Sequence, residues 1–350
     1  MSATTARDVP GAAPDPAARW RAALRPEERR ALLETNDWRG WLSIGLDWGL
    51  VFAAMALVAA TSGGWLLLSV PIALCVIGAR QLGFAVLMHE AAHHTLFRNR
   101  ALNDWAGNWL CAYPIWADLH PYRRYHLRHH AKNGTPEDPD LDLATKFPVS
   151  AASLRRKIWR DLSGQVGLKR ARAVLARDLR GARGKTARAA GAAGSAGPRE
   201  SAPPEDLVGW RNLRGVAVAN LLLFALLAAA GHPALYALWA GAWLTTNSLA
   251  TRIRSIAEHN MAPDAGDELR NSRTTLARWW ERLLIAPNRV NFHLEHHLMM
   301  TVPFYRLPAF HRLLQERGVL EGALVERGYA GVLRRAASGR VELRTRVPAA

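Results

Sequence analysis

Four long apolar segments alternate with polar, basic stretches along the chain. They cover approximately residues 45–61, 64–84, 214–230 and 233–253. Roughly 20 residues of helix cross a hydrocarbon core of about 30 Å, so each segment is long enough to span a membrane. The turns inside each pair, at 61–64 and 231–233, carry no Lys, Arg, Asp or Glu. The pattern predicts an all-α, integral membrane protein whose four transmembrane helices form two hairpins.

Positive charge gathers on one side of these hairpins. The chain has 46 Lys and Arg against 29 Asp and Glu, a formal net charge of +17. Basic loops stay in the cytoplasm, so we predict a protein of the cytoplasmic membrane whose termini and long central loop are cytoplasmic. A nucleic-acid-binding protein would need a basic face on a soluble module, which apolar runs of this length do not provide. The expected partners are therefore membrane lipids and not nucleic acid.

The chain divides into three regions. Residues 1–40 are predicted to form a cytoplasmic N-terminal amphipathic region, 41–315 the membrane domain, and 316–350 a cytoplasmic C-terminal tail. Inside the domain, 167–206 is an insertion rich in Ala, Gly and Arg, predicted to be a basic helix followed by a linker. A fifth apolar stretch, Ala101 to Asp118, is interrupted by Asn, Asp and Pro, so it is expected to lie along the membrane interface rather than to cross.

Histidine is concentrated in three short clusters. Nine of the 13 histidines lie in them: His89, His93 and His94 in HEAAHH, His126, His129 and His130 in YHLRHH, and His293, His296 and His297 in FHLEHH. Side chains three and four residues apart share one face of a helix, so each cluster offers two or three imidazoles in one direction. All three clusters fall in the predicted cytoplasmic part, which we expect to be a helical cap. They can therefore meet and bind metal.

The number of imidazoles favours two metal ions. One catalytic zinc takes three protein ligands, whereas eight or more histidines are present here, and His259 in RSIAEHN is a candidate extra ligand. A set rich in nitrogen, with open positions, suits iron that handles dioxygen better than magnesium or calcium. Nearby Glu90, Glu258 and Glu295 are candidates to hold the outer ring nitrogens. The isolated His120, His232 and His311 are expected to be ordinary polar residues.

Two other interpretations stay open from the residues alone. HEAAH also fits the helical zinc motif of a metalloprotease, with Glu90 as general base, although two histidine triplets would then have no role. A membrane protein that binds metal without catalysis would use the same clusters.

The histidine clusters resemble the three boxes of the integral-membrane fatty acid desaturases and hydroxylases, HX3–4H, HX2–3HH and (H/Q)X2HH. The similarity covers approximately residues 40–315 and includes the flanks HHAKNGTPEDPD and HHLMMTVPFYRLPAFHRLL. It implies nine metal ligands: His89, His93, His126, His129, His130, His259, His293, His296 and His297. HEAAHH satisfies both HX3H and HX4H, so His94 could replace or supplement His93; the bacterial members that the chain resembles favour His93.

The resemblance also implies the activity. Its members are O2-dependent oxidoreductases with two non-haem iron ions, which here would introduce a double bond into a fatty acyl chain or lipid. A hydroxylase or ketolase is the nearest alternative, because the ligand set does not distinguish them. The two cysteines form no haem or iron–sulfur motif, and there is no GxGxxG. Electrons are therefore expected from an external donor, a ferredoxin or a b-type cytochrome with its reductase.

Overall fold

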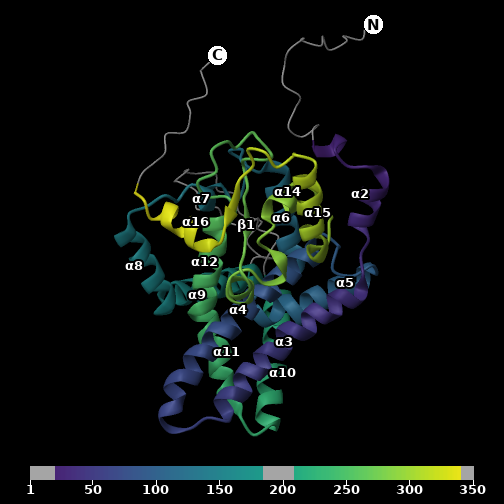
Figure 1. The fold of residues 1–350 in the computed structure, drawn as a ribbon. Coiled ribbons are helices and arrows are strands. Elements are labelled where there is room, and N and C mark those ends of the chain that lie inside the picture. Colours follow the sequence, from purple (N-terminus) through teal and green to yellow (C-terminus); the bar gives the residue numbers. More distant parts are fainter. Residues whose placement is uncertain (1–19, 184–208, 340–350) are drawn as a thin grey trace, which may run out of the picture.

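The protein is mostly helical (Figure 1). The computed structural model describes residues 20–183 and 209–339. Three helices are long and apolar enough to cross a membrane, over Asp37–Ala59, Gly63–Ala92 and Arg211–Ala229. They correspond to α3 (Asp37–Ala59), η1 (Gly63–Trp65) with α4 (Leu66–Ala92), and α10 (Trp210–Ala229). The prediction of an all-α membrane protein is confirmed to this extent.

The fourth predicted crossing differs from the expectation of one long helix. It consists of η6 (Pro233–Leu235), α11 (Tyr236–Leu244) and α12 (Thr246–Glu258). The break lies at Thr245, where the backbone takes φ −115° and ψ −88° and the hydroxyl donates to the Gly241 carbonyl at 2.6 Å. A neighbouring helix approaches closely here, because a Cβ on Gly167 would collide with the Leu244 backbone. The interruption therefore comes from tertiary packing.

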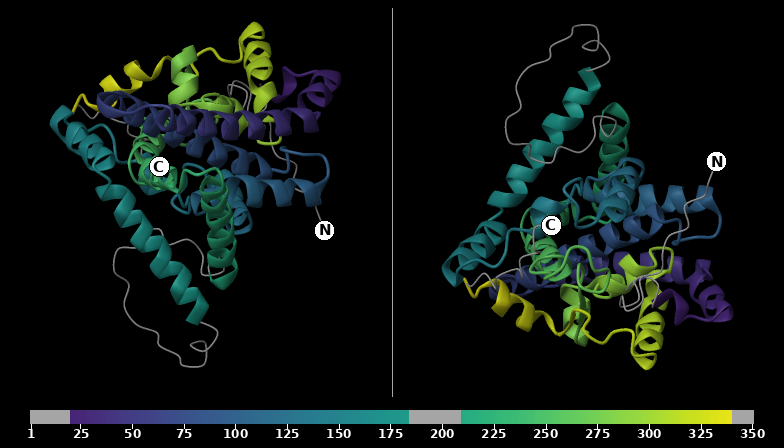
Figure 2. Two further views of the ribbon diagram at one scale, coloured as in Figure 1. Left: turned by 90° about the horizontal axis from the view of Figure 1, so that it is seen from below. Right: turned by 90° about the horizontal axis from the view of Figure 1, so that it is seen from above.

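The start of the basic insertion is a packed helix. Helices α8 (Ala151–Leu162) and α9 (Gln165–Arg183) form an arm along one side of the molecule (Figure 2). The Arg170 guanidinium lies 3.9 Å from the centre of the Trp243 ring, and the buried Asp178 accepts a 2.8 Å hydrogen bond from Asn212. This helix thus rests on α10 and α11. The predicted linker, from 184 onwards, lies outside the described residues.

The fifth apolar stretch folds as three short segments. They are α5 (Arg100–Ala106), the π-helix η2 (Gly107–Ala112) and the 3-10 turn η3 (Tyr113–Ile115). Trp105 and Trp109 are exposed, whereas Asn108 and Cys111 are buried. The stretch therefore has one apolar aromatic edge and one face packed on the protein.

The remaining elements form a cap at the end of the bundle opposite the two turns (Figure 1). They are α2 (Pro26–Leu33), α6 (Leu119–Lys132), α7 (Leu141–Ala144), α13 (Trp279–Leu284), η7 (Pro287–Arg289), α14 (His293–Leu298), η8 (Phe304–Arg306), α15 (Leu307–Glu316) and α16 (Tyr329–Ala336), with strands β1 (Thr274–Leu276) and β2 (Val325–Arg327). The strands are parallel, with Thr274 opposite Val325. Residues after 316, assigned from sequence to a tail, thus contribute β2 and α16 to the cap.

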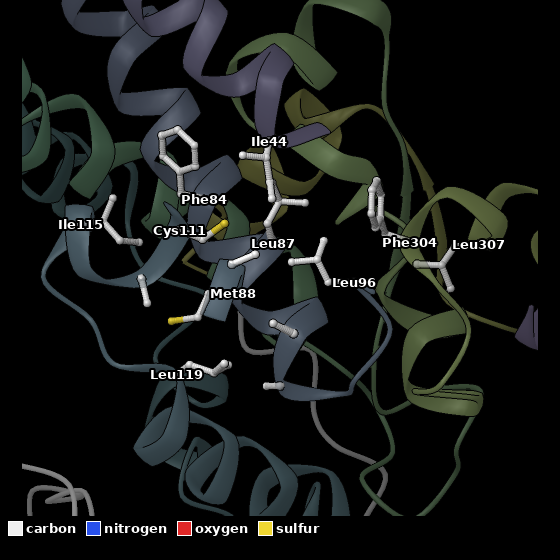
Figure 3. Close-up of a cluster of buried hydrophobic side chains, with 14 of the residues drawn as sticks. Ile44, Phe84, Leu87, Met88, Leu96, Cys111, Ile115, Leu119, Phe304 and Leu307 are labelled. Carbon is white, nitrogen blue, oxygen red and sulfur yellow. The ribbon is translucent and has the colours of Figure 1, made fainter. Parts of the chain in front are cut away.

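Helix α4 is the central element of the core. In its most apolar window 61% of residues are buried, against 28% for α3 and for α10. Phe84, Leu87 and Met88 on its second half pack with Ile44 from α3 and Leu119 from α6 (Figure 3). This packing fixes the end of α4, which carries the first histidine cluster.

A buried ion pair joins the first two apolar helices to the cap. A basic residue in the second half of a membrane-crossing helix can extend its charge to the interface, but Arg80 is only 6% exposed and donates to Asp47 at 2.8 Å. The Asn288 amide donates to the other Asp47 oxygen at 2.8 Å, and Arg80 also donates to the Leu283 carbonyl. The Arg80 side chain does not extend to the interface, because its guanidinium group is paired with the buried Asp47 carboxylate. The cap is thereby hydrogen-bonded to both α3 and α4.

We predict that Gly78→Ala destabilises the protein by about 1–3 kcal/mol, the usual cost of overpacking. A Cβ on Gly78 would collide with the Thr246 hydroxyl and come 2.7 Å from the Asn247 backbone nitrogen. Gly45→Ala on α3 is the matched control, because nothing lies within 4 Å of its Cβ position. Thermal unfolding in detergent, followed by size-exclusion chromatography, measures both. Equal melting temperatures for the two variants would contradict this tight α4–α12 contact.

Candidate metal centre

The histidines from the three sequence clusters converge on two sites. One group contains His89, His93, His126, His130 and His296, and the other contains His129, His259 and His297. Within each group, one ring nitrogen of every residue lies within 4.8 Å of the corresponding nitrogens of the others. The groups combine side chains from α4, α6 and α14 with those of the residues that directly follow α4 and α12.

Helical spacing divides each triplet between the two groups. On α6, His126 and His130 are one turn apart and face the first group, whereas His129 faces the second. On α14 the order is reversed: His296 turns toward the first group, and His297 turns toward the second. A short H-x-x-H-H segment therefore directs imidazoles to both groups, and this arrangement places the two groups side by side.

His293 completes the second group. Its Nε2 atom lies 2.8 Å from Nε2 of His259, and its ring centre is 4.5 Å from that of His297. His259 follows the last residue of α12, where its Nδ1 contacts the Asn271 carbonyl at 3.2 Å. All nine histidines proposed from the sequence are therefore close to one another.

His94 points away from both groups. Its backbone adopts the left-handed conformation, with φ 59°, directly after the end of α4. Its Nδ1 atom lies 3.8 Å from Asp104 and 3.5 Å from Arg123. The structure thus brings His93, and not His94, into the first group. The isolated His120 and His232 also lie outside the groups.

The geometry of the rings fits metal ions. Unprotonated nitrogens that face each other repel, yet Nε2 of His130 lies 2.9 Å from that of His126 and 3.0 Å from that of His296. Two nitrogens bound at right angles to one ion, each about 2.1 Å away, would be about 3.0 Å apart. The buried Nε2 atoms of His89 and His93 have no hydrogen-bond partner within the described protein. A cation at the centre of each group would satisfy these nitrogens.

Carboxylates and carbonyls orient several rings from behind. Asp138 contacts Nδ1 of His129 at 2.8 Å, Glu90 contacts Nδ1 of His89 at 3.3 Å, and Glu258 contacts Nδ1 of His293 at 3.5 Å. Such partners fix the ring orientation and leave Nε2 for a metal. Glu90 and Glu258 thus have the positions expected from the sequence.

Glu295 has a different role from the expected one, and one carboxylate was missed. Glu295 contacts His311 at 2.6 Å and accepts from Thr274, so it braces α14 rather than a ring of either group. His311, expected to be an ordinary polar residue, is buried in this contact. Asp138 was not singled out; its signal was the acidic EDPD run that follows the second box.

Burial keeps the rings neutral. It lowers the pKa of His93 and of His259 to about 3 and that of His130 to about 2, with a smaller contribution from neighbouring histidines and arginines. Imidazole binds metals through an unprotonated nitrogen, so the rings are in the binding form at neutral pH. Both groups are made of imidazole alone, without a carboxylate ligand among the described residues.

A cavity of about 310 Å³ adjoins both groups. His126 borders it from the first group, and His129, His259 and His293 border it from the second. Tyr122, Thr251, Arg254 and Ser255 form part of the remaining wall. Ligand pockets typically measure about 300–1,000 Å³, so a segment of a substrate fits here beside both groups.

Apolar helices that could cross a membrane and a cap with two all-histidine groups are the features of a membrane protein whose histidines can hold metal. Comparison with known proteins specifies the class further. The fatty acid desaturase family matches residues 64–325, and the chain belongs to this family. It is an oxidoreductase, a desaturase. This membership overturns the metalloprotease interpretation of HEAAH.

Similar proteins carry the same class name. Dihydrorhizobitoxine desaturase of Bradyrhizobium elkanii is 27% identical over 290 residues, which cover 79% of this chain and 75% of that protein. Chloroplastic omega-6 fatty acid desaturases are 30% identical over shorter regions. The one from Glycine max matches over 129 residues, 37% of this chain and 29% of its own length, and the one from Brassica napus over 103 residues, 29% and 22%.

Proposed function

We propose that the protein introduces a double bond into a fatty acyl chain, using dioxygen and two iron ions held by the nine histidines. The convergence of three distant histidine clusters into two adjacent groups is the observation that carries this proposal. The first ion would be held by His89, His93, His126, His130 and His296, and the second by His129, His259, His293 and His297. Iron with dioxygen supplies the oxidising power to remove hydrogen from an unactivated carbon, which no side chain has.

The protein's own residues bind and orient the reacting groups. Asp138, Glu90 and Glu258 hold the outer nitrogens of three rings, so the imidazoles are fixed before metal arrives. The acyl chain would lie in the cavity beside Tyr122 and Thr251, next to residues of both histidine groups. Glu90 also accepts from the Thr95 hydroxyl and the Phe304 backbone nitrogen, and these contacts hold it in place behind His89.

The membrane arrangement is part of the proposal. We propose that α11 and the first part of α12 together make the fourth crossing, so that two hairpins turn on one side and the metal centre is cytoplasmic. The region 41–315 would be the desaturase domain, flanked by 1–40 and 316–350. Electrons would come from a ferredoxin, or from a b-type cytochrome with its reductase. The net charge of +17 favours an acidic carrier.

We expect the purified protein to bind about two iron ions per chain, because its histidines form two groups. Cells that express it are expected to contain lipids whose acyl chains have lost two hydrogens. Elemental analysis and mass spectrometry of lipids measure these two quantities. One zinc per chain with unchanged lipids would contradict the proposal. A product that gains oxygen would identify a hydroxylase.

A further inference from the structure

A second cavity, of about 340 Å³, lies beside α5, η2, α6 and the beginning of α10. It is separate from the cavity beside the histidine groups, because the two share no lining residue. Arg211 and Arg214 border it from α10, and His120 borders it from α6. The proposed reaction gives none of these residues a role.

The cavity carries uncompensated positive charge. Arg211 and Arg214 are exposed, and neither forms an ion pair with any residue of the described chain. Asp104 is the one carboxylate in the wall, but Arg123 already pairs with it at 2.5 Å and again at 3.1 Å. Arg211 hydrogen-bonds to Tyr113, which also lines the cavity, but no carboxylate of the described residues pairs with Arg211 or Arg214. The two guanidinium charges therefore leave the cavity suited to an anion. Guanidinium groups match phosphate oxygens especially well, since they can donate two parallel hydrogen bonds.

Both arginines are held on a fixed helix. A Cβ on Gly215 would collide with the Tyr113 ring, so α10 packs directly on η3. Further along α10, Asn220 donates to the Tyr113 carbonyl at 3.3 Å and accepts a 3.0 Å hydrogen bond from the Tyr236 hydroxyl. The spacing of Arg211 and Arg214 is therefore set by the fold before any ligand binds.

The surface around the cavity is that of a protein at a membrane boundary. Trp105 and Trp109, which border the cavity, are 50% and 37% exposed, and tryptophan is enriched at the level of lipid headgroups. Farther along α10, Leu221, Leu222 and Leu226 are 65%, 63% and 56% exposed, as expected for a face in contact with acyl tails. Along the expected membrane normal, the two arginines are thus followed by the exposed tryptophans and then by the exposed leucines of α10.

We propose that this cavity binds the phosphate of an anionic phospholipid headgroup, through Arg211 and Arg214, while the lipid tails lie along the leucine face of α10. The inference relies on the membrane orientation proposed above, but it does not depend on the metal centre.

The cavity is also connected to the first histidine group. Arg123, which pairs with Asp104, donates to the carbonyls of Ala91 and Ala92 at 2.8 and 3.0 Å, immediately before His93.

Lipid retention by the full-length protein tests the site. The protein is purified in neutral detergent and mixed with phosphatidylglycerol or phosphatidylcholine, and bound lipids are counted by native mass spectrometry. Arg211→Gln combined with Arg214→Gln is expected to lower phosphatidylglycerol retention by about tenfold or more, because two charge-assisted contacts are lost. Arg155→Gln combined with Arg156→Gln, on the exposed side of α8, removes the same charge elsewhere and is expected to change retention little.

Several results would overturn the proposal. Equal losses in the two double variants would mean that the lipid responds to overall charge. Equal retention of phosphatidylcholine and phosphatidylglycerol would show that no anionic headgroup is selected. Displacement of the lipid by millimolar inorganic phosphate would identify a site for a free anion. If the glutamine variant does not fold, Arg211→Lys with Arg214→Lys serves instead, and its retention is expected to fall between wild type and the glutamine variant.

Discussion

Replacing His130 by alanine is expected to abolish desaturation and to remove about half of the bound iron. Nε2 of His130 contacts Nε2 of both His126 and His296, so this ring is central to the first group. Loss of a ligand should exceed the roughly 10–100-fold cost of losing a partner one step behind the metal. The second group keeps His129, His259, His293 and His297, and we expect it to retain its iron. Iron content per chain and acyl-chain analysis measure the two effects.

His94→Ala is the matched control for this variant. It also removes one imidazole from a histidine box, but His94 faces Asp104 and Arg123 outside both groups. We expect this variant to keep two iron ions and most of its activity. If His94→Ala lost iron as His130→Ala does, the alternative HX4H spacing would describe the first box, and the assignment of His93 would be wrong.

Replacing Asp138 by asparagine is expected to weaken iron binding and activity by about 10–100-fold. The Asp138 carboxylate accepts a 2.8 Å hydrogen bond from Nδ1 of His129. Its negative charge increases the electron density that the other ring nitrogen can donate to a metal. Asparagine preserves the shape, and its amide oxygen can still accept from the Asp140 backbone nitrogen, which donates to Oδ1 of Asp138 at 2.8 Å. Only the longer contact is lost, that of the Gly134 backbone nitrogen with Oδ2 at 3.2 Å, because an amide has a single acceptor oxygen. The fold should therefore survive the change.

Glu137→Gln, one residue away, removes a carboxylate that is exposed and contacts no histidine of either group in the described structure. Iron retained during dialysis against a chelator and the melting temperature are measured for both variants. If Asp138 positions the metal-binding ring, Asp138→Asn should lose iron faster than Glu137→Gln, and the two variants should have similar melting temperatures. Parallel losses of iron and of melting temperature would indicate a role in folding instead.

Local sequence patterns were sufficient to predict the long apolar helices and the histidine clusters. The apolar length of α3, α4 and α10 follows from the thickness of a bilayer, and the spacing of histidines follows from the helical repeat. Glu90 and Glu258 were found because each is a direct sequence neighbour of a histidine. Glu90 follows His89, and Glu258 precedes His259.

Features set by distant parts of the chain could not be predicted in this way. The break at Thr245 lies beside Gly167, which is 78 positions earlier on α9 and permits a close contact with Leu244. Whether a given ring of an H-x-x-H-H triplet joins one group or the other depends on which helices surround it. The burial of Arg80 could not be predicted from local sequence, because its partner, Asp47, belongs to a different helix and is a single acidic residue in an apolar segment.

The contact between Asp47 and Arg80 also bears on how the chain enters the bilayer during synthesis. The two residues are 33 positions apart, whereas Asn288 follows Asp47 by 241 positions. When the first hairpin leaves the ribosome and is inserted, the carboxylate and the guanidinium can already neutralise each other, which reduces the cost of placing either charge in lipid. Asn288 and the Leu283 carbonyl become available only after the last apolar segment has been made. The pair thus first neutralises the charge of the hairpin during insertion. Later it is the contact through which the cap is hydrogen-bonded to α3 and α4.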